Sequence, residues 1–285
     1  DGLDVYQRIL AGIRGHLASG GSFVCELFEE NLQTAAALAR TLFIRVTTAP
    51  DLTGRERFLH ASSLWSATPT LPIDPTDPDE NDIALASTAL LFGQPLIFPT
   101  DTVYGIGVAV LPNATPQRIY DLKVREADKP IAWLVGPGED GDLTAALSFY
   151  GADVPPYAYE LAGAFWPGAL TLVVKASGEV PPAFASPAGT VALRMPDHAV
   201  PLALIAAVGT PLATSSANRS GENPACTADE IDACLIQQVP MTLNAGRTDV
   251  QIASTVVDCT GTLPNILRQG SISEEAIHGV CEKVY

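Results

Sequence analysis

The chain has 285 residues, 47% of them hydrophobic, so it can form one large domain or two smaller ones around sizeable cores. Nearly all of its formal net charge of −16 is carried by residues 71–285, which hold ten Lys or Arg against 25 Asp or Glu. An acidic surface of this kind repels nucleic-acid phosphates and anionic lipids, which argues against membrane-surface binding and against tight, unaided RNA binding.

The first 62 residues predict a small αβαββ unit. Apolar residues recur at helical spacing over 3–17, and Gly20 and Gly21 end this helix. The elements that follow are a strand at 22–27, an alanine-rich helix at 32–42, and strands at 43–48 and 57–61. The unit is small for an independent domain, and its open sheet would expose an edge.

Residues 63–80 predict a linker between two domains. The segment 69–80 reads PTLPIDPTDPDE, with four prolines at three-residue spacing and acidic residues between them. Proline lacks a backbone N–H and fixes φ, so we expect neither a helix nor a paired strand here.

Residues 81–285 predict a second, larger domain in which helices and strands are mixed. Helices are expected at 81–93, 115–123, 157–164, 198–207 and 227–236, and strands at 95–98, 131–135, 170–175, 191–194, 211–213 and 254–258. This order lacks the strict βαβ alternation of a doubly wound fold. We therefore expect an α/β (α+β) domain on a twisted mixed sheet.

The cysteines argue against a disulfide framework and against a zinc site. The five (Cys25, Cys226, Cys234, Cys259 and Cys281) are odd in number, widely spaced and without a CxxC pair. There is also no apolar run long enough to span a membrane, and no signal peptide. A cytoplasmic protein is the expectation.

Two segments offer polar groups directly after an apolar stretch. Residues 98–107 read FPTDTVYGIG, and Asp101 is the one acidic residue within this motif. Residues 123–130 read KVREADKP, which places Lys123, Arg125 and Lys129 close together. Such cations suit a phosphate-bearing ligand, although a solvated helix end would carry them equally well.

Three further segments place polar side chains at the ends of expected strands. Arg194 ends an apolar strand and would need an anionic partner, either a ligand or a structural salt bridge. His198 follows it, and a single histidine of this kind is more typical of an exposed or capping residue than of a ligand contact. In TSSANRSG, Ser216 and Asn218 offer a hydroxyl and an amide, as a substrate site or as ordinary turn chemistry. Arg268 is either a ligand cation or a surface arginine on a loop.

Taken together and in order, these motifs resemble the YrdC/TsaC family of L-threonylcarbamoyladenylate synthases. The segments are PTDTVYGIG, KVR, FWPGALTLV, VALRMPDH, SSANRSG, STVVD and ILRQG, over about residues 80–277. The resemblance implies a nucleotidyltransferase that converts L-threonine, bicarbonate or CO2, and ATP into threonylcarbamoyl-AMP and pyrophosphate. The product would feed the t6A37 modification of tRNA through a threonylcarbamoyl-transferase complex, with direct tRNA binding weak at most.

The resemblance also assigns roles residue by residue. Positions that hold threonine in the family correspond to Thr102, Arg194, Ser216 and Ser254. Positions that hold ATP correspond to Lys123, Arg125, Lys129, Thr190, Asn218, Cys226 (through its backbone) and Arg268. Lys123, Arg125 and Arg194 would be catalytic by neutralising charge, and Mg2+ would bind the phosphates without direct protein ligands. Leu134 stands where family members carry a threonine-contacting His.

The N-terminal unit resembles the C-terminal end of HemK/PrmC-type glutamine methyltransferases. The segments that carry this resemblance are GLDVYQRIL, LASGGSFVCE and DLTGRERFLHA. The glycine-rich S-adenosylmethionine loop and the NPPY-type motif are absent from the sequence, so residues 1–62 are expected to bind no methyl donor. A noncatalytic RNA-binding module on the YrdC-like fold is the alternative function for the chain.

Overall fold

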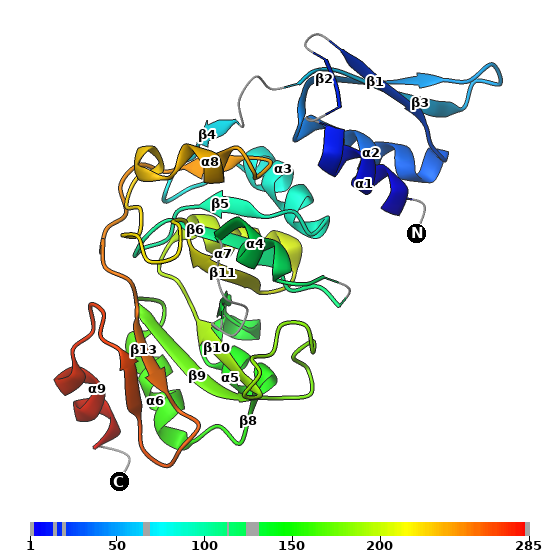
Figure 1. Ribbon diagram of the computed structural model, residues 1–285. Helices are drawn as coiled ribbons and strands as arrows, with labels where there is room; N and C mark the ends of the chain where they lie inside the picture. The colour runs from blue at the N-terminus through cyan, green and yellow to red at the C-terminus, as the bar shows by residue number, and fades with distance from the viewer. Residues whose placement is uncertain are drawn as a thin grey trace.

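The computed structural model describes residues 3–13, 16–18, 21–64, 69–112, 114–123 and 131–282. Their strands form two sheets, one of three strands near the N-terminus and one of 11 strands in the rest of the chain (Figure 1). Among the described residues, no helix has the length and apolarity that a membrane span requires.

The N-terminal elements follow the predicted αβαββ order. They are α1 (Asp4–Gly12), β1 (Ser22–Glu26), α2 (Glu29–Arg40), β2 (Phe43–Pro50) and β3 (Glu56–Leu64). The sheet order is β1-β3-β2, with both pairs antiparallel and His60 opposite both Val24 and Thr47. Apolar residues at helical spacing on α1, among them Tyr6 and Leu10, are buried against α2 and the sheet.

The proline-rich segment corrects one prediction, because Thr70–Pro72 forms strand β4. It pairs in parallel with β12 (Thr242–Asn244), and the next residue, Ile73, donates its N–H to the Asn244 carbonyl at 2.9 Å. β4 is the last strand at one edge of the large sheet. An edge strand needs hydrogen bonds on one side only, which is why Pro72 is tolerated there.

The remaining elements build the large body. The helices are α3 (Glu80–Leu91), α4 (Gln117–Lys123), α5 (Ala145–Tyr150), α6 (Pro156–Phe165), α7 (Ala199–Val208), α8 (Ala233–Ile236) and α9 (Glu274–Cys281), with 3-10 turns at Glu139–Gly141 and Ala228–Glu230. The strands are β5 (Leu96–Phe98), β6 (Gly105–Ala109), β7 (Ala132–Leu134), β8 (Gly151–Ala152), β9 (Leu170–Ala176), β10 (Thr190–Arg194), β11 (Leu212–Ser216), β13 (Thr255–Asp258) and β14 (Asn265–Arg268).

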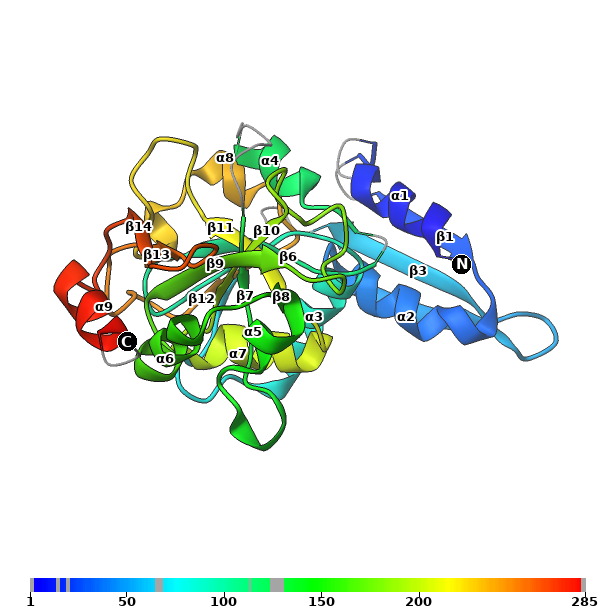
Figure 2. The same cartoon turned by 90° about the horizontal axis from the view of Figure 1, so that it is seen from below.

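The large sheet is mixed, as predicted. Its order is β14-β13-β9-β10-β7-β11-β6-β5-β12-β4, with β8 beside β9. β10 runs parallel to β7 and antiparallel to β9, and β11 is antiparallel to both β6 and β7. In the view of Figure 2, α5, α6 and α7 lie on one side of this sheet and α4 and α8 lie on the other.

One predicted helix is wrong in extent. The segment 227–236 contains a 3-10 turn and the four-residue helix α8 instead of one continuous helix. The Asp232 side chain accepts the Cys234 N–H at 2.8 Å, so Asp232 caps a new helix start in the middle of the predicted element.

Candidate functional site

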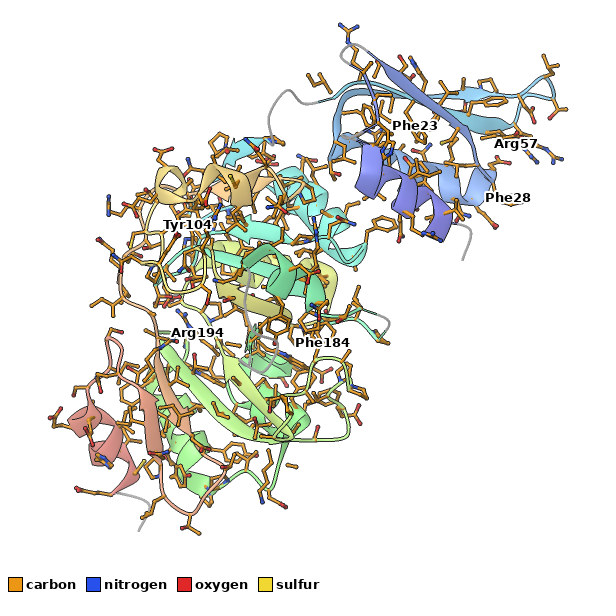
Figure 3. The ribbon with its side chains drawn as sticks, viewed as in Figure 1. Phe23, Phe28, Arg57, Tyr104, Phe184 and Arg194 are labelled. Carbon is orange, nitrogen blue, oxygen red and sulfur yellow. The ribbon has the colours of Figure 1, made fainter. Side chains whose placement is uncertain are left out.

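A cavity of about 240 Å³ is lined by residues of β6, β7, β9, β10, β11, β13 and β14 and by the turn that follows β5. Hydroxyl and guanidinium groups supply its polar lining, from Thr100, Thr102, Tyr104, Thr171, Arg194, Thr214, Ser215, Ser216, Ser254 and Arg268. Figure 3 labels two of these side chains, Tyr104 and Arg194, on the large body. None of the described lining residues is acidic, so this cavity is positively lined in a chain of net charge −16.

Arg194 is held by three acceptors, two of them on the adjacent residues Asp101 and Thr102 and the third on Gly168. Its Nε donates to the Gly168 carbonyl at 3.0 Å, Nη1 to Thr102 Oγ1 at 2.8 Å, and Nη2 to Asp101 Oδ1 at 2.6 Å. The residue is 6% exposed, and burial lowers the pKa of its guanidinium while the Asp101 carboxylate opposes that shift. Arg194 therefore forms the structural salt bridge weighed from the sequence and also faces the cavity.

The hydroxyl of Thr102 is held on two sides. Its Oγ1 accepts from Arg194 Nη1 at 2.8 Å and lies 3.0 Å from Thr100 Oγ1, a contact in which either oxygen could be the donor. Because a hydroxyl has one hydrogen and two lone pairs, Thr102 keeps a hydrogen-bonding position for a ligand in the cavity.

Lys123, Ser216 and Asn218 come together at the end of β11. The Lys123 ammonium donates to the Ser216 carbonyl, and lies 3.4 Å from Ser216 Oγ and 3.3 Å from Asn218 Oδ1. Asn218 Nδ2 in turn donates to the carbonyls of Arg219 and Glu222. Lys123 is 1% exposed, so it is not the solvated helix-end cation that the sequence left open. Ser216 is the last residue of β11, so the turn begins after it.

Ser254 and Arg268 meet on the opposite side of the cavity, beside a residue that the sequence reasoning missed. Arg268 donates through Nε and Nη2 to the Ser254 carbonyl at 3.1 and 3.0 Å. Ser254 Oγ lies 2.8 Å from Oγ1 of Thr171, which is buried and lines the cavity. Thr171 lies within the apolar strand LTLVVKA, and that single hydroxyl on a buried strand was the available signal.

Thr190 lies in a second, adjoining cavity of about 170 Å³. Ile131 and Ala192 line both cavities, so the two are neighbours along β10. Side chains alternate along a strand, so Thr190, Ala192 and Arg194 lie on one face of β10. The rise of about 3.3 Å per residue places Thr190 about 13 Å from Arg194 along the strand. Phe184, which Figure 3 labels, also lines this second cavity.

Cys226 does not line either of these cavities, and its backbone is already engaged. Its N–H donates to Glu230 Oε2 at 2.7 Å, and its carbonyl accepts the Thr248 N–H at 2.9 Å. A contact of ATP with the Cys226 N–H would require the bond to Glu230 to be replaced, whereas the carbonyl keeps a second lone pair with which to accept. Two other expected ATP contacts, Arg125 and Lys129, lie outside the described residues.

Leu134 and His198 complete the set of residues singled out from the sequence. Leu134 is 3% exposed and lines the first cavity, where it places an apolar surface. His198 caps α7, with its Nδ1 accepting the Val200 N–H at 3.2 Å, and burial lowers the pKa of its imidazole. His198 is therefore the capping residue weighed from the sequence.

A scan against family models matches residues 88–270 to the family Sua5_yciO_yrdC, described as "Telomere recombination". Among curated proteins, the chain is 39% identical over 210 residues to a candidate threonylcarbamoyl-AMP synthase of Mycobacterium tuberculosis, covering 73% of this chain and 94% of that protein. It is 33% identical over 223 residues to the threonylcarbamoyl-AMP synthase of Bacillus subtilis, covering 78% of this chain but 62% of the relative.

Solved structures show the same architecture. P. abyssi Sua5, solved in complex with L-threonine, superposes with a TM-score of 0.66 at 33% identity, covering 74% of this chain and 61% of that one. E. coli YciO superposes with a TM-score of 0.63 at 24% identity, covering 72% of this chain and 96% of the other, and supports the fold alone. The chain thus spans nearly all of some relatives and less than two thirds of others.

Proposed function

The chain belongs to the Sua5/YciO/YrdC family, and on this premise we propose that it is a threonylcarbamoyl-AMP synthase. The reaction would join L-threonine, bicarbonate or CO2, and ATP into threonylcarbamoyl-AMP and pyrophosphate, for the t6A37 modification of tRNA. The observation that carries the proposal is a cavity without described acidic lining residues, in which Arg194 is fixed beside the Thr102 hydroxyl.

The arginine and Thr102 offer complementary groups to an amino acid. A guanidinium has five N–H groups, and Arg194 uses one on each nitrogen for Gly168, Thr102 and Asp101. The two remaining N–H groups, one on each Nη, are suited to the threonine carboxylate. The Thr102 hydroxyl, fixed by Arg194, would contact the threonine amine beside that carboxylate.

The other threonine contacts would come from the two hydroxyls on either side of the cavity, Ser216 and Ser254. Leu134 offers an apolar surface where family members carry His, which suits the threonine methyl group. Thr171, hydrogen-bonded to Ser254, would hold that serine in place.

ATP would extend along β10 toward the second cavity. Arg268 lines the first cavity and Thr190 lines the second. Along β10, about 13 Å separates Thr190 from Arg194, which suits a molecule as long as an aminoacyl adenylate. Lys123, beside Ser216, adds a buried cation next to this path. Asn218, Cys226, Arg125 and Lys129 are the remaining proposed ATP contacts.

Mg2+ fits as a companion of ATP rather than as a protein-bound ion. The described lining residues include no carboxylate, and no cluster of His, Cys, Asp and Glu among the described residues could hold a metal ion. Bound with ATP, the ion would supply positive charge that neutralises the phosphates. The protein's own cations, Arg268 and Lys123, would add to that neutralisation and orient the chain of phosphates.

The chemistry needs positioning and charge neutralisation instead of a covalent nucleophile. The threonine nitrogen attacks CO2 and loses a proton, which gives a carbamate. A carbamate oxygen then attacks the α-phosphorus of ATP in line, and the bond to the bridging oxygen breaks as pyrophosphate leaves. Arg194 holds the amino acid at one end, and cations at the other stabilise the charge that develops on the phosphates.

The N-terminal unit lies outside the matched family segment, and we propose that residues 1–62 derive from the C-terminal end of a methyltransferase-like domain. The support is the quoted sequence motifs together with the αβαββ order of the described elements. We further propose that residues 63–80 connect this unit to a YrdC-like domain of residues 81–285, with β4 of the connecting segment paired to the sheet of that domain. A cytoplasmic location and a separate threonylcarbamoyl-transferase complex are further parts of this proposal.

The proposal is tested by pyrophosphate release from ATP with L-threonine and bicarbonate added separately and together. We expect release only when both are present, and at least about a hundredfold slower release from Arg194→Ala because the carboxylate contact is lost. Arg247→Ala is the matched control, since Arg247 pairs with Glu230 at the surface. Release that is independent of threonine would refute the synthase, and tight tRNA binding without turnover would favour the RNA-binding alternative.

A further inference from the structure

Asp101 is a buried carboxylate for which the proposed reaction has no role so far. It lies in the turn after β5, is 4% exposed, and is not a lining residue of the cavity. Its Oδ1 lies 2.6 Å from Arg194 Nη2, and both side chains are almost fully buried. Its own carbonyl accepts the Val250 N–H at 2.9 Å, so the loop around residue 250 holds the turn in place.

The contact fixes the direction of the Arg194 guanidinium. Gly168 O, Thr102 Oγ1 and Asp101 Oδ1 each bind a different nitrogen. Gly168 O is a backbone atom, and the backbone of Asp101 is held by Val250. A planar guanidinium bound at all three nitrogens cannot rotate about its long side chain. The Asp101 contact thereby determines where the remaining N–H groups of Arg194 point.

The contact also balances the charge of Arg194 in the absence of substrate. An unpaired buried cation is costly and would seek water or another acceptor. Asp101 supplies the counter-charge without being one of the residues that line the cavity. The guanidinium can therefore stay buried at the cavity before any amino acid binds.

We propose that Asp101 is a positioning residue, which orients Arg194 for the carboxylate of the amino-acid substrate and so sets the affinity for that substrate. The inference rests on the proposed function for the identity of the amino acid, L-threonine. The positioning role can be tested without catalytic turnover, because the orientation of Arg194 would act on the binding of the amino acid.

Two substitutions separate positioning from bulk stability. Asp101→Ala removes the acceptor, so the KM for L-threonine should rise about tenfold or more while the KM for ATP changes less than about twofold. Asp101→Asn retains an oxygen that can accept from Nη2, and should recover most of the lost affinity. Asp249→Asn is the control, because Asp249 is an exposed acidic residue near His198 and is not one of the three hydrogen-bond partners of Arg194.

A binding measurement keeps this inference separate from the proposed function. Calorimetric titration with L-threonine alone should show binding to the wild-type chain and to Asp101→Asn, and much weaker binding to Asp101→Ala. If the wild-type chain binds threonine more tightly than Asp101→Ala does but releases no pyrophosphate, the synthase is refuted and the positioning role is supported. Active wild-type protein together with unchanged threonine affinity in Asp101→Ala would overturn the positioning role alone.

A purely structural role predicts a different pattern. In that case Asp101→Ala and Asp101→Asn would lower the melting temperature and raise the KM values for threonine and ATP together, which would also overturn the inference. If Asp101→Ala does not fold, the comparison of Asp101→Asn with a second variant, Asp101→Ser, decides. The serine hydroxyl is one bond too short to take the place of Oδ1 beside Arg194 Nη2, so Asp101→Ser should weaken threonine binding more than Asp101→Asn does.

Discussion

The charged side chains that matter most for the proposed reaction are buried, although the chain as a whole is strongly acidic. Lys123 and Arg194 are 1% and 6% exposed, and each is surrounded by fixed oxygen acceptors. Arg194 keeps one N–H on each Nη beyond its bonds to Gly168, Thr102 and Asp101. In the proposed reaction these groups would let an acidic protein bind the carboxylate of its substrate at this cavity.

His198 provides a test of residue-scale electrostatics through pH. Burial lowers the pKa of its imidazole despite the nearby Asp101, Asp249 and Asp197 carboxylates, and Nδ1 must be unprotonated to accept the Val200 N–H. The folded state therefore binds this proton less readily than the unfolded chain, whose His pKa is about 6.5. Stability from this group is present above that pKa and is lost as the pH falls below it.

The expected result concerns His198→Asn, because asparagine also caps a helix but does not titrate. Between pH 7 and pH 5 the melting temperature of the wild-type chain should fall further than that of His198→Asn. Thermal unfolding followed by circular dichroism at several pH values measures the difference. Parallel pH profiles for the two proteins would contradict the role of His198 as a buried, neutral cap.

At the scale of elements, the sequence predicted segments with a clear apolar pattern and missed segments without one. The helix at 198–207 and the strand at 170–175 were found from such patterns, and so was the three-residue strand β5. β6 was missed, since GIGVA lies inside a motif and its glycines hide the strand pattern. The strands β12 and β14 have three and four residues, and they exist because their neighbours pair with them.

Part of the predicted site lies together in the structure. The resemblance placed Arg194, Thr102 and Ser216 in one site, and all three line the first cavity, whereas Thr190 and Cys226 do not. The sequence could not show that Asp101 stands behind Arg194, because the two residues are 93 positions apart. It could not show Thr171 beside Ser254 either, since a buried threonine in a strand is common without any function.

The pairing of β6 with β11 gives a prediction at the element scale. Gly105 lies opposite Ser216, and a Cβ at Gly105 would stand 2.7 Å from Cγ2 of Thr214. Gly105→Ala should therefore lower the free energy of unfolding by about 1–3 kcal/mol through overpacking. Thr214→Ser removes only that methyl group and should restore most of the loss. Urea denaturation of the single and double variants measures both effects.

Gly163→Ala is the matched control for this experiment. Gly163 lies within α6, and a Cβ there meets nothing within 4 Å, so alanine should be neutral or stabilise by about 0.5–1 kcal/mol. A destabilised Gly105→Ala that Thr214→Ser does not rescue would show that the clash lies elsewhere, and the close packing of β6 against β11 would not be its cause.

At the scale of the whole molecule, the two sheets are joined by more than a linker. α2 of the N-terminal unit lies against α3 of the large body, and Phe92 packs against the N-terminal core. The proline-rich segment itself enters the large sheet as β4 (Figure 1). Asn244, beside β4, also accepts from the Tyr104 hydroxyl at 3.2 Å, so the segment after the N-terminal unit supports a residue that lines the cavity.

Ile73 tests whether this segment belongs to the large body. Its side chain is 7% exposed within the core formed by α3, α7 and the adjacent strands, so Ile73→Ala should lower the free energy of unfolding by about 2–5 kcal/mol. Trp133 and Trp166 are buried in the large body, and their fluorescence during urea unfolding reports its stability. Ile252→Ala is the control, because Ile252 is 54% exposed and its loss should change stability by less than about 0.5 kcal/mol. Equal, small effects of the two substitutions would mean that residues 70–73 act only as a tether; a large effect of Ile73→Ala alone would mean that the chain between the two units is part of the fold that carries the site.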